Sequence, residues 1–157
     1  MIEQPPPAEG DPGHWVRAAL ERHERQLMQY ATRILGGDLD RARDVVQETF
    51  LRLCNQRRGD VEQHLTEWLY RVCRNQAFDV RRKESRMSTL SEDHHASSTD
   101  ASASPAAAME RQDELGRVLG CLTRLPEKQQ EVLRLKFQHG LSYQEIARVT
   151  EESIGNV

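Results

Sequence analysis

Several features that proteins commonly depend on are scarce in this 157-residue sequence. Aromatic residues make up 5% of it, and its three cysteines, Cys54, Cys73 and Cys121, lie far apart. Any core must therefore be largely aliphatic, and the cysteines, without a secretory leader pattern, argue against a disulfide framework. No apolar run approaches the length needed to cross a membrane. We expect a cytoplasmic protein without membrane insertion, built from small helical domains.

Patterns typical of enzymes and metal proteins are missing as well. The sequence contains no glycine-rich phosphate loop and no nucleophile elbow. Asp44 with Glu48 could supply acid–base chemistry, and Glu92 with His95 has the E-x-x-H spacing used in di-iron bundles. A di-iron site needs a second matching motif, and none is present. We therefore expect no enzymatic activity, no cofactor and no metal.

The formal net charge of -3 conceals an uneven distribution. Residues 14–86 carry a net charge of +4 and residues 109–157 one of -1, whereas segments 1–13 and 87–108 each hold three acidic residues and no basic one. Binding to a polyanion depends on the local field rather than on the total charge. The basic balance of residues 14–86 is thus compatible with a nucleic-acid partner.

Helical periodicity indicates three or four helices around one aliphatic core in residues 14–86. The first is expected over residues 14–35, and the second begins at Asp38 or Asp40 as N-cap and continues to Asn55. His23, on the apolar side of the first, is expected to be a packed histidine rather than a ligand. The side chains expected in this core are Val16, Leu20, His23, Leu27, Ala31, Ile34, Ala42, Val46, Thr49 and Leu53, with Val45 and Phe50 beside them.

The outer side of the second expected helix carries an acidic stripe. Asp44, Gln47, Glu48 and Leu51 follow one another at helical spacing, which puts a leucine where solvent is expected. A charged outer side is normal for a surface helix, and a single exposed leucine is common. Periodicity alone therefore leaves open whether this stripe is a docking surface.

The helix expected over residues 65–83 has two contrasting sides, and residues 55–66 turn and lead into it. Its core side holds Leu65, Leu69, Val72, Gln76 and Val80, with Trp68 and Cys73 at the margins. Its opposite side collects Tyr70, Arg71, Arg74, Phe78, Arg81 and Arg82. Arginine neutralises phosphate, and an aromatic ring offers an unpaired base a stacking surface. A solvated basic face with half-buried rings fits the periodicity equally well.

The remaining segments are predicted to be a tail, a linker and a second small domain. Residues 1–13 are rich in proline and glycine and are expected to be disordered, and residues 87–108, rich in serine, to be a flexible linker. In residues 109–157, the expected apolar positions are Leu115, Val118, Leu119 and Leu122, then Val132, Leu133, Leu135 and Phe137 on a helix over residues 127–138. Ser142 and Glu145 form a capping box, and Ser153 is a plausible cap for a further helix. This order is typical of a helix-turn-helix, although a plain helical hairpin fits as well.

Three runs of residues resemble bacterial RNA polymerase sigma factors, and the small extracytoplasmic-function group most closely. Residues 44–53 contain a D-x-x-Q-E motif, and residues 68–82 read W-L-x-R-x-x-x-N-x-x-x-D-x-x-R. Residues 122–147 contain an L-x-x-L-P run followed by G-L-S-Y-Q-E-I-A, which resembles the minus-thirty-five-binding domain. The resemblance implies an all-α fold with a promoter-melting domain of three to four helices and a helix-turn-helix domain, joined by a flexible linker.

The resemblance also implies roles for particular residues. In such factors the D-x-x-Q-E helix docks on the clamp coiled coil of the largest subunit of core RNA polymerase. The matching residues here are Asp44, Gln47 and Glu48, with Leu51 extending the patch. The W-L-x-R helix and the loop before it, about residues 57–64, contact the minus-ten promoter element and capture an unstacked base. The DNA-binding residues are then Trp68, Arg71, Arg74, Asn75, Asp79, Arg81 and Arg82, with Phe78 added from the periodicity, and the helix-turn-helix residues are Ser142, Gln144, Glu145, Ser153 and Asn156.

The function implied is that of a transcription initiation factor with no catalytic residue of its own. Its partners would be core RNA polymerase, promoter DNA and an anti-sigma factor, and it would be monomeric when free. The sequence stops at Val157, a few residues into the expected recognition helix, so we expect weak minus-thirty-five reading. We also expect a loose second domain, because Ile146 and Val149 would lack an apolar partner. The alternative is a transcription-inactive protein that docks on core polymerase or an anti-sigma factor.

Overall fold

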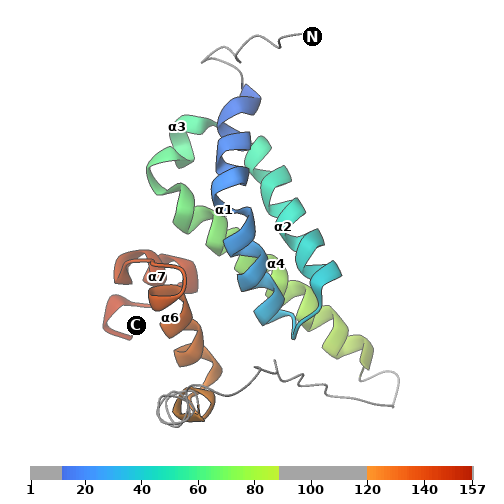
Figure 1. The fold of residues 1–157 in the computed structure, drawn as a ribbon, viewed down its shortest axis with the longest axis vertical. Helices are drawn as coiled ribbons and strands as arrows, with labels where there is room; N and C mark the ends of the chain where they lie inside the picture. The colour runs from blue at the N-terminus through green and yellow to red at the C-terminus, as the bar shows by residue number, and fades with distance from the viewer. Residues whose placement is uncertain (1–11, 89–119, 157) are drawn as a thin grey trace, which may run out of the picture. The chain divides into compact units, whose positions relative to one another are not determined.

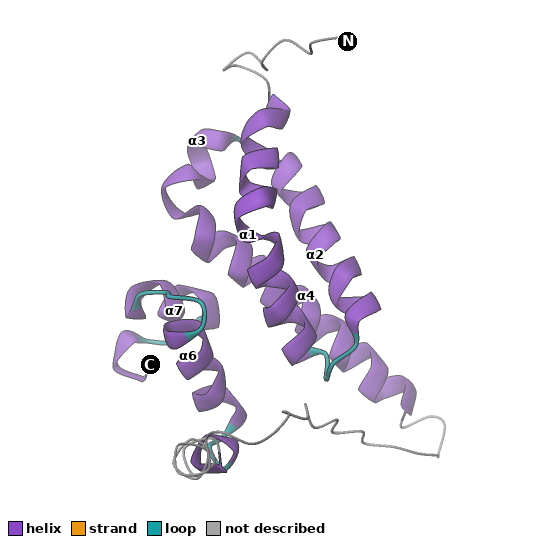
Figure 2. Cartoon of the chain, viewed as in Figure 1, coloured by secondary structure: helices purple, strands orange, loops and turns teal. Residues whose placement is uncertain are grey.

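The structure, a computed structural model, describes residues 12–88 and 120–156 of the chain (Figure 1). Within these two ranges every regular element is a helix and none is a strand (Figure 2). The predicted all-α fold is therefore confirmed. The chain divides into two compact units, residues 1–97 and 98–157, and each is described here by itself. Most of the predicted tail and linker, and the Glu92–His95 pair, lie outside the described residues.

Three long helices pack against one another to form the first unit. They are α1 (Pro12–Ile34), α2 (Leu39–Cys54) and α4 (Leu65–Ser88), and each contacts the other two (Figure 1). Two short elements, α3 (Arg58–Val61) and η1 (Glu62–His64), connect α2 to α4. The expected arrangement of three to four helices is thus present.

The turn between α1 and α2 follows the residues that predicted it. Gly36 and Gly37 have φ angles of +67° and +98°, a region that glycine adopts without steric cost. Asp38 is the N-cap of α2, and its Oδ1 accepts a hydrogen bond of 3.0 Å from the backbone N–H of Arg41. Of the two possible starts, Asp38 is therefore the correct one.

The core of this unit contains most of the expected side chains. Those that are buried are His23, Leu27, Ala31, Ala42, Val45, Val46, Thr49, Phe50 and Leu53, while Val16, Leu20 and Ile34 are half-buried. Thr49 satisfies its hydroxyl group by donating to the carbonyl oxygen of Val45 at 2.8 Å. His23 is a packed histidine, as predicted, with 5% of its surface exposed.

The burial of His23 makes the first unit sensitive to acid. Its Nδ1 atom is buried and bonds to no group in the described part of the chain. Burial, together with the nearby charge of Arg22, lowers the pKa of His23 below its ordinary value of 6.5. The unfolded chain therefore binds this proton more readily, so the folded state loses stability as the pH falls below 6.5, and this loss is absent above that pH.

We expect His23→Leu to raise the free energy of unfolding of the first unit by about 1 kcal/mol at neutral pH, because it removes a buried polar atom without a partner. The variant should also lose less stability than the wild type as the pH falls below 6.5. Both tryptophans, Trp15 and Trp68, lie in this unit, so urea unfolding followed by tryptophan fluorescence measures it selectively. An unchanged pH dependence would contradict this role of His23.

The buried side of α4 differs from the predicted one. Tyr70, expected on the solvent side, is completely buried, and its ring meets that of Tyr30 edge to face, with centroids 5.3 Å apart. Val72 and Val80, expected in the core, are only half-buried, whereas Ala77 is fully buried. The stripe that faces α1 and α2 is thus rotated toward Tyr70, because a tyrosine partner on α1 gives this large ring a place to pack.

The segment before α4 is helical rather than a loop. α3 and η1 cover residues 58–64, and Arg58 donates from Nε and a terminal nitrogen to one oxygen of Glu62, at 3.0 and 2.6 Å. This i,i+4 pair favours the helical turn, which the sequence pattern did not predict. α4 also continues to Ser88, five residues beyond its expected end at Lys83.

The second unit contains α6 (Glu127–Phe137), α7 (Tyr143–Thr150) and η2 (Ile154–Asn156), and residues 120–123 are helical as well. Leu135, Leu141, Ile146 and Val149 are buried in it. The expectation that Ile146 and Val149 lack an apolar environment is wrong, because both have no exposed surface. Phe137, expected in the core, is instead 78% exposed, since it is the last residue of α6.

The end of α7 holds an unfavourable backbone conformation. Glu151 has a φ of 59° and a ψ of 32°, the left-handed region that costs a non-glycine residue about 1–2 kcal/mol. We expect Glu151→Gly to stabilise the second unit by about 1 kcal/mol and to slow hydrogen exchange of the α7 amides about fivefold. Glu152→Gly is the matched control, because it removes the 2.8 Å ion pair with Lys128 and should not protect α7. Faster exchange in Glu151→Gly would contradict the expectation.

Candidate functional site

One side of α2 presents the four residues of the acidic stripe to solvent. Asp44, Gln47, Glu48 and Leu51 are all exposed, and Leu51 has 56% of its surface in contact with solvent. The opposite side of α2 is buried against α1 and α4. The position of the stripe is therefore fixed by the core, and its four side chains are available to a partner.

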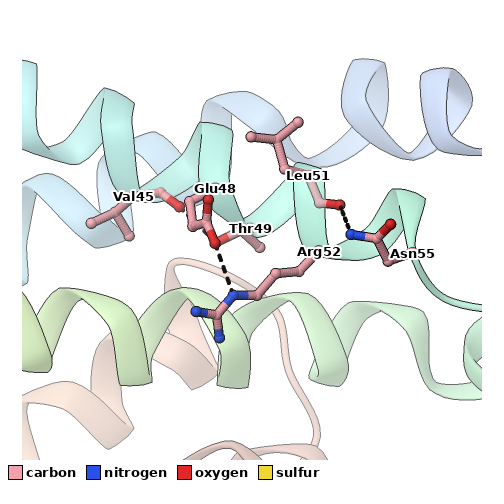
Figure 3. Close-up of polar contacts among 6 residues, drawn as sticks. All are labelled: Val45, Glu48, Thr49, Leu51, Arg52 and Asn55. Atoms are coloured by element: carbon pink, nitrogen blue, oxygen red, sulfur yellow. Dashed lines mark hydrogen bonds and ion pairs between the residues drawn. The ribbon is translucent and has the colours of Figure 1, made fainter.

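Two local contacts order this stripe (Figure 3). The Nε of Arg52 donates to Oε1 of Glu48 at 3.1 Å, and Nδ2 of Asn55 donates to the carbonyl oxygen of Leu51 at 3.2 Å. The ion pair is exposed, so it contributes only about 0.3–0.5 kcal/mol. Its effect is to hold the Glu48 carboxylate along the helix toward Arg52. Sequence reasoning missed Arg52, although its i,i+4 spacing from Glu48 is a recognisable signal.

The exposed side of α4 carries a basic cluster around one aromatic ring. The guanidinium carbons of Arg74 and Arg81 lie 4.7 and 4.8 Å from the centroid of the Phe78 ring. Asp79 lies on the same helix and makes an exposed ion pair of 3.7 Å with Arg82. The predicted alternation of arginine and aromatic residues is thus real around Phe78. Arg71 is half-buried, and Asn75 is exposed.

Two aromatic residues of α4 lie in the core and not on this side: Tyr70, which periodicity put here, and Trp68, which periodicity put at the margin of the core. Trp68, which the family resemblance places among the DNA-binding residues, is only 8% exposed and lies in the core. Tyr70 is buried completely, which raises the pKa of its phenol above the ordinary value. Consecutive residues 68, 69 and 70 are all buried because α4 is covered from two directions, by α1 and by α2. The aromatic ring of α4 that remains partly accessible is therefore that of Phe78, which is half-buried.

The helix-turn-helix residues begin with a complete capping box. The backbone N–H of Glu145 donates to the Ser142 hydroxyl oxygen at 3.2 Å, and the N–H of Ser142 donates to Oε2 of Glu145 at 2.7 Å. This confirms the predicted start of α7. Gln144, Ser153 and Asn156 are exposed. Sequence reasoning missed the ammonium group of Lys136, which lies 4.6 Å from the centroid of the exposed Tyr143 ring.

The cysteines and the other titratable groups form no reactive centre in the described residues. Cys73 is buried, which raises the pKa of its thiol to about 12, although a hydrogen bond with Thr49 opposes part of this shift. Cys54 and Cys121 are exposed and free. In residues 12–88 and 120–156, no three metal-ligating side chains come together. No helix in the same ranges is long and apolar enough to cross a membrane.

Comparisons with known proteins match both units. The family model Sigma-70 region 2 matches residues 19–87, and Sigma-70, region 4 matches residues 115–157. The chain is 33% identical over 138 residues to the ECF RNA polymerase sigma factor SigL of Mycobacterium tuberculosis, covering 84% of this chain and 74% of that protein. It is 31% identical over 116 residues to the ECF RNA polymerase sigma factor SigM of Bacillus subtilis, covering 73% and 69% respectively. The first family match contains α2 and most of α4, and the second contains α6 and α7.

Proposed function

Because the chain belongs to the extracytoplasmic-function group of sigma factors, we propose that it docks on core RNA polymerase through α2 and holds the opened minus-ten element of a promoter with α4. Membership in this family makes the chain a transcription initiation factor that acts in promoter recognition. The assignment of docking to α2 and of strand capture to α4 belongs to this proposal. We place its action in the cytoplasm, together with the polymerase.

The observation that carries the docking proposal is the exposure of the acidic stripe on α2. Asp44 and Glu48 offer carboxylates, Gln47 an amide and Leu51 an apolar side chain, all on the side of α2 that faces away from the core. A surface of this kind suits a partner helix that brings basic side chains around one apolar contact. We therefore assign it to the clamp coiled coil of the largest polymerase subunit.

The proposal for α4 depends on its charge and on the half-buried ring of Phe78. Arg74, Arg81 and Arg82 can neutralise phosphates of a DNA strand, and of these Arg81 and Arg82 are exposed while Arg74 is half-buried. Opening a duplex costs a few kcal/mol for each base that is extruded. Contacts to the exposed strand offset this cost, so the protein promotes opening by capturing a strand and makes or breaks no covalent bond.

The second unit is proposed to read the minus-thirty-five element through its helix-turn-helix. Ser142, Gln144 and Glu145 lie at the start of α7, and Ser153 and Asn156 lie at the start of η2 and within it. Promoter binding should therefore depend on the minus-thirty-five sequence, and equal binding after that sequence is scrambled would contradict this assignment.

A transcription-inactive docking protein is the second candidate, because the proposed docking stripe on α2 is separate from the basic cluster on α4. Transcription with purified core polymerase and a promoter with a strong minus-ten element separates the two. We expect abortive RNA, whereas docking without RNA synthesis would favour the inactive interaction protein. We propose an anti-sigma factor as a further partner. Such a factor would be identified by its ability to abolish RNA synthesis when it is added in stoichiometric amount.

A further inference from the structure

The ring of Phe78 lies between two guanidinium groups on α4. Arg74 precedes Phe78 by one helical turn, and Arg81 follows it by almost one turn. Their guanidinium carbons are nearly equidistant from the ring centroid, at 4.7 and 4.8 Å. Both distances are within the range at which the negative face of an aromatic ring attracts a cation.

The two arginines flank Phe78 on its N-terminal and C-terminal sides in α4. Two positive charges on one face of the ring would repel each other at short range. Because the residues flank Phe78 on its N-terminal and C-terminal sides, each guanidinium can instead use a separate face. A base that stacked on Phe78 would then have to displace one of them.

We propose that Phe78 is a positioning residue that holds Arg74 and Arg81 apart as a pair of phosphate-binding groups, and that it does not stack on a DNA base. This inference rests on the proposed promoter-binding function of α4. An arginine side chain loses considerable rotamer freedom when it binds, and a ring that already orders it reduces this loss. The ion pair between Asp79 and Arg82, at 3.7 Å, involves a different arginine from the two that lie against Phe78.

The ligand of the pair is the sugar–phosphate backbone of the captured strand. Arg74 and Arg81 are seven residues apart, about 10 Å along the helix axis, so each is assigned its own phosphate. Each phosphate contact on single-stranded DNA contributes about 0.7 to the slope of log affinity against log salt concentration. Loss of both contacts would therefore make this slope shallower by about 1.4.

The test measures binding of the holoenzyme to forked promoter DNA over a series of salt concentrations. We expect Phe78→Leu to weaken binding at low salt about three- to tenfold and to make the salt slope shallower by about 1. Phe78→Tyr keeps an aromatic face and should restore both affinity and slope. Arg43→Ala is the matched control for loss of charge, because Arg43 is an exposed arginine on α2 that pairs with Asp40; it should leave the slope unchanged.

Three results would overturn the inference. Phe78→Leu could weaken binding with an unchanged slope, it could lose its effect when the captured nucleotide is abasic, or it could have no effect. The first two indicate base stacking, and the third indicates no role in binding. Thermal melting by tryptophan fluorescence checks that the variant is folded, and Phe78→Met provides a second aliphatic variant if it is not. If wild-type holoenzyme itself does not bind the fork, the proposed function of α4 fails rather than the role of Phe78.

Discussion

Charge reversal at Glu48 is expected to weaken binding to core RNA polymerase about 100-fold, because truncating or reversing one partner of a close charge pair in an interface costs about 2–5 kcal/mol. Glu48 is one of the four exposed residues of the proposed docking surface on α2, and its carboxylate reaches toward Arg52 (Figure 3). It pairs with Arg52 at 3.1 Å, and this exposed pair adds little to stability. Glu48→Arg should therefore fold normally. Titration of fluorescently labelled chain with core polymerase measures the change directly.

Two controls make the Glu48 result specific. Glu48→Gln removes the charge without reversing it and should give a smaller loss of affinity. Glu24→Arg reverses an exposed carboxylate on α1, outside the acidic stripe, and should bind core polymerase as the wild type does. If Glu24→Arg and Glu48→Arg weaken binding equally, the effect is one of total charge, and the assignment of the α2 surface is wrong.

The double variant Arg74→Ala with Arg81→Ala is expected to reduce promoter opening at least about tenfold, because each charge-assisted contact to phosphate contributes about 1.5–3 kcal/mol before screening. Binding to core polymerase should stay within about twofold of wild type, since an exposed position outside the docking surface has little effect on affinity. Permanganate reactivity of unpaired thymines in the minus-ten element measures opening, and the core titration measures docking.

The arginine double variant also needs a control for loss of positive charge. Arg33→Ala with Arg43→Ala removes two exposed arginines from α1 and α2 and should leave opening unchanged. Equal losses of opening and of core binding in the Arg74 and Arg81 variant would mean that these side chains support only the packing of the first unit.

Local signals in the sequence were sufficient to predict α2 almost completely. Asp38 has the side chain of an N-cap, the two glycines before it permit positive φ angles, and the apolar positions repeat at helical spacing. The acidic stripe followed directly, because burying Val46 and Leu53 places Glu48 on the other side. The capping box at Ser142 was predicted for the same reason, since its hydrogen bonds join residues only three apart.

Features that depend on contacts between distant residues were not predictable from the sequence pattern. Tyr70 is buried because Tyr30 and Gln26 on α1 meet it, with its hydroxyl 3.4 Å from Oε1 of Gln26. Periodicity within α4 contains no information about that partner. Phe137 shows the converse, because an apolar residue at a helix end can be exposed when nothing packs over it. The sequence spacing predicted that Arg74 and Arg81 lie near Phe78. Only the structure gives the distances from their guanidinium carbons to the ring centroid.

A transcription assay in which variant chains compete with the wild-type chain for core polymerase tests most directly whether α2 and α4 perform separate tasks. Each variant chain is added in excess to core polymerase and wild-type chain on one promoter. The Arg74→Ala with Arg81→Ala chain should occupy the polymerase without opening DNA and therefore inhibit, whereas the Glu48→Arg chain should fail to bind and have no effect. Inhibition by both variants, or by neither, would contradict the claim that one exposed face binds the polymerase and another holds the promoter strand.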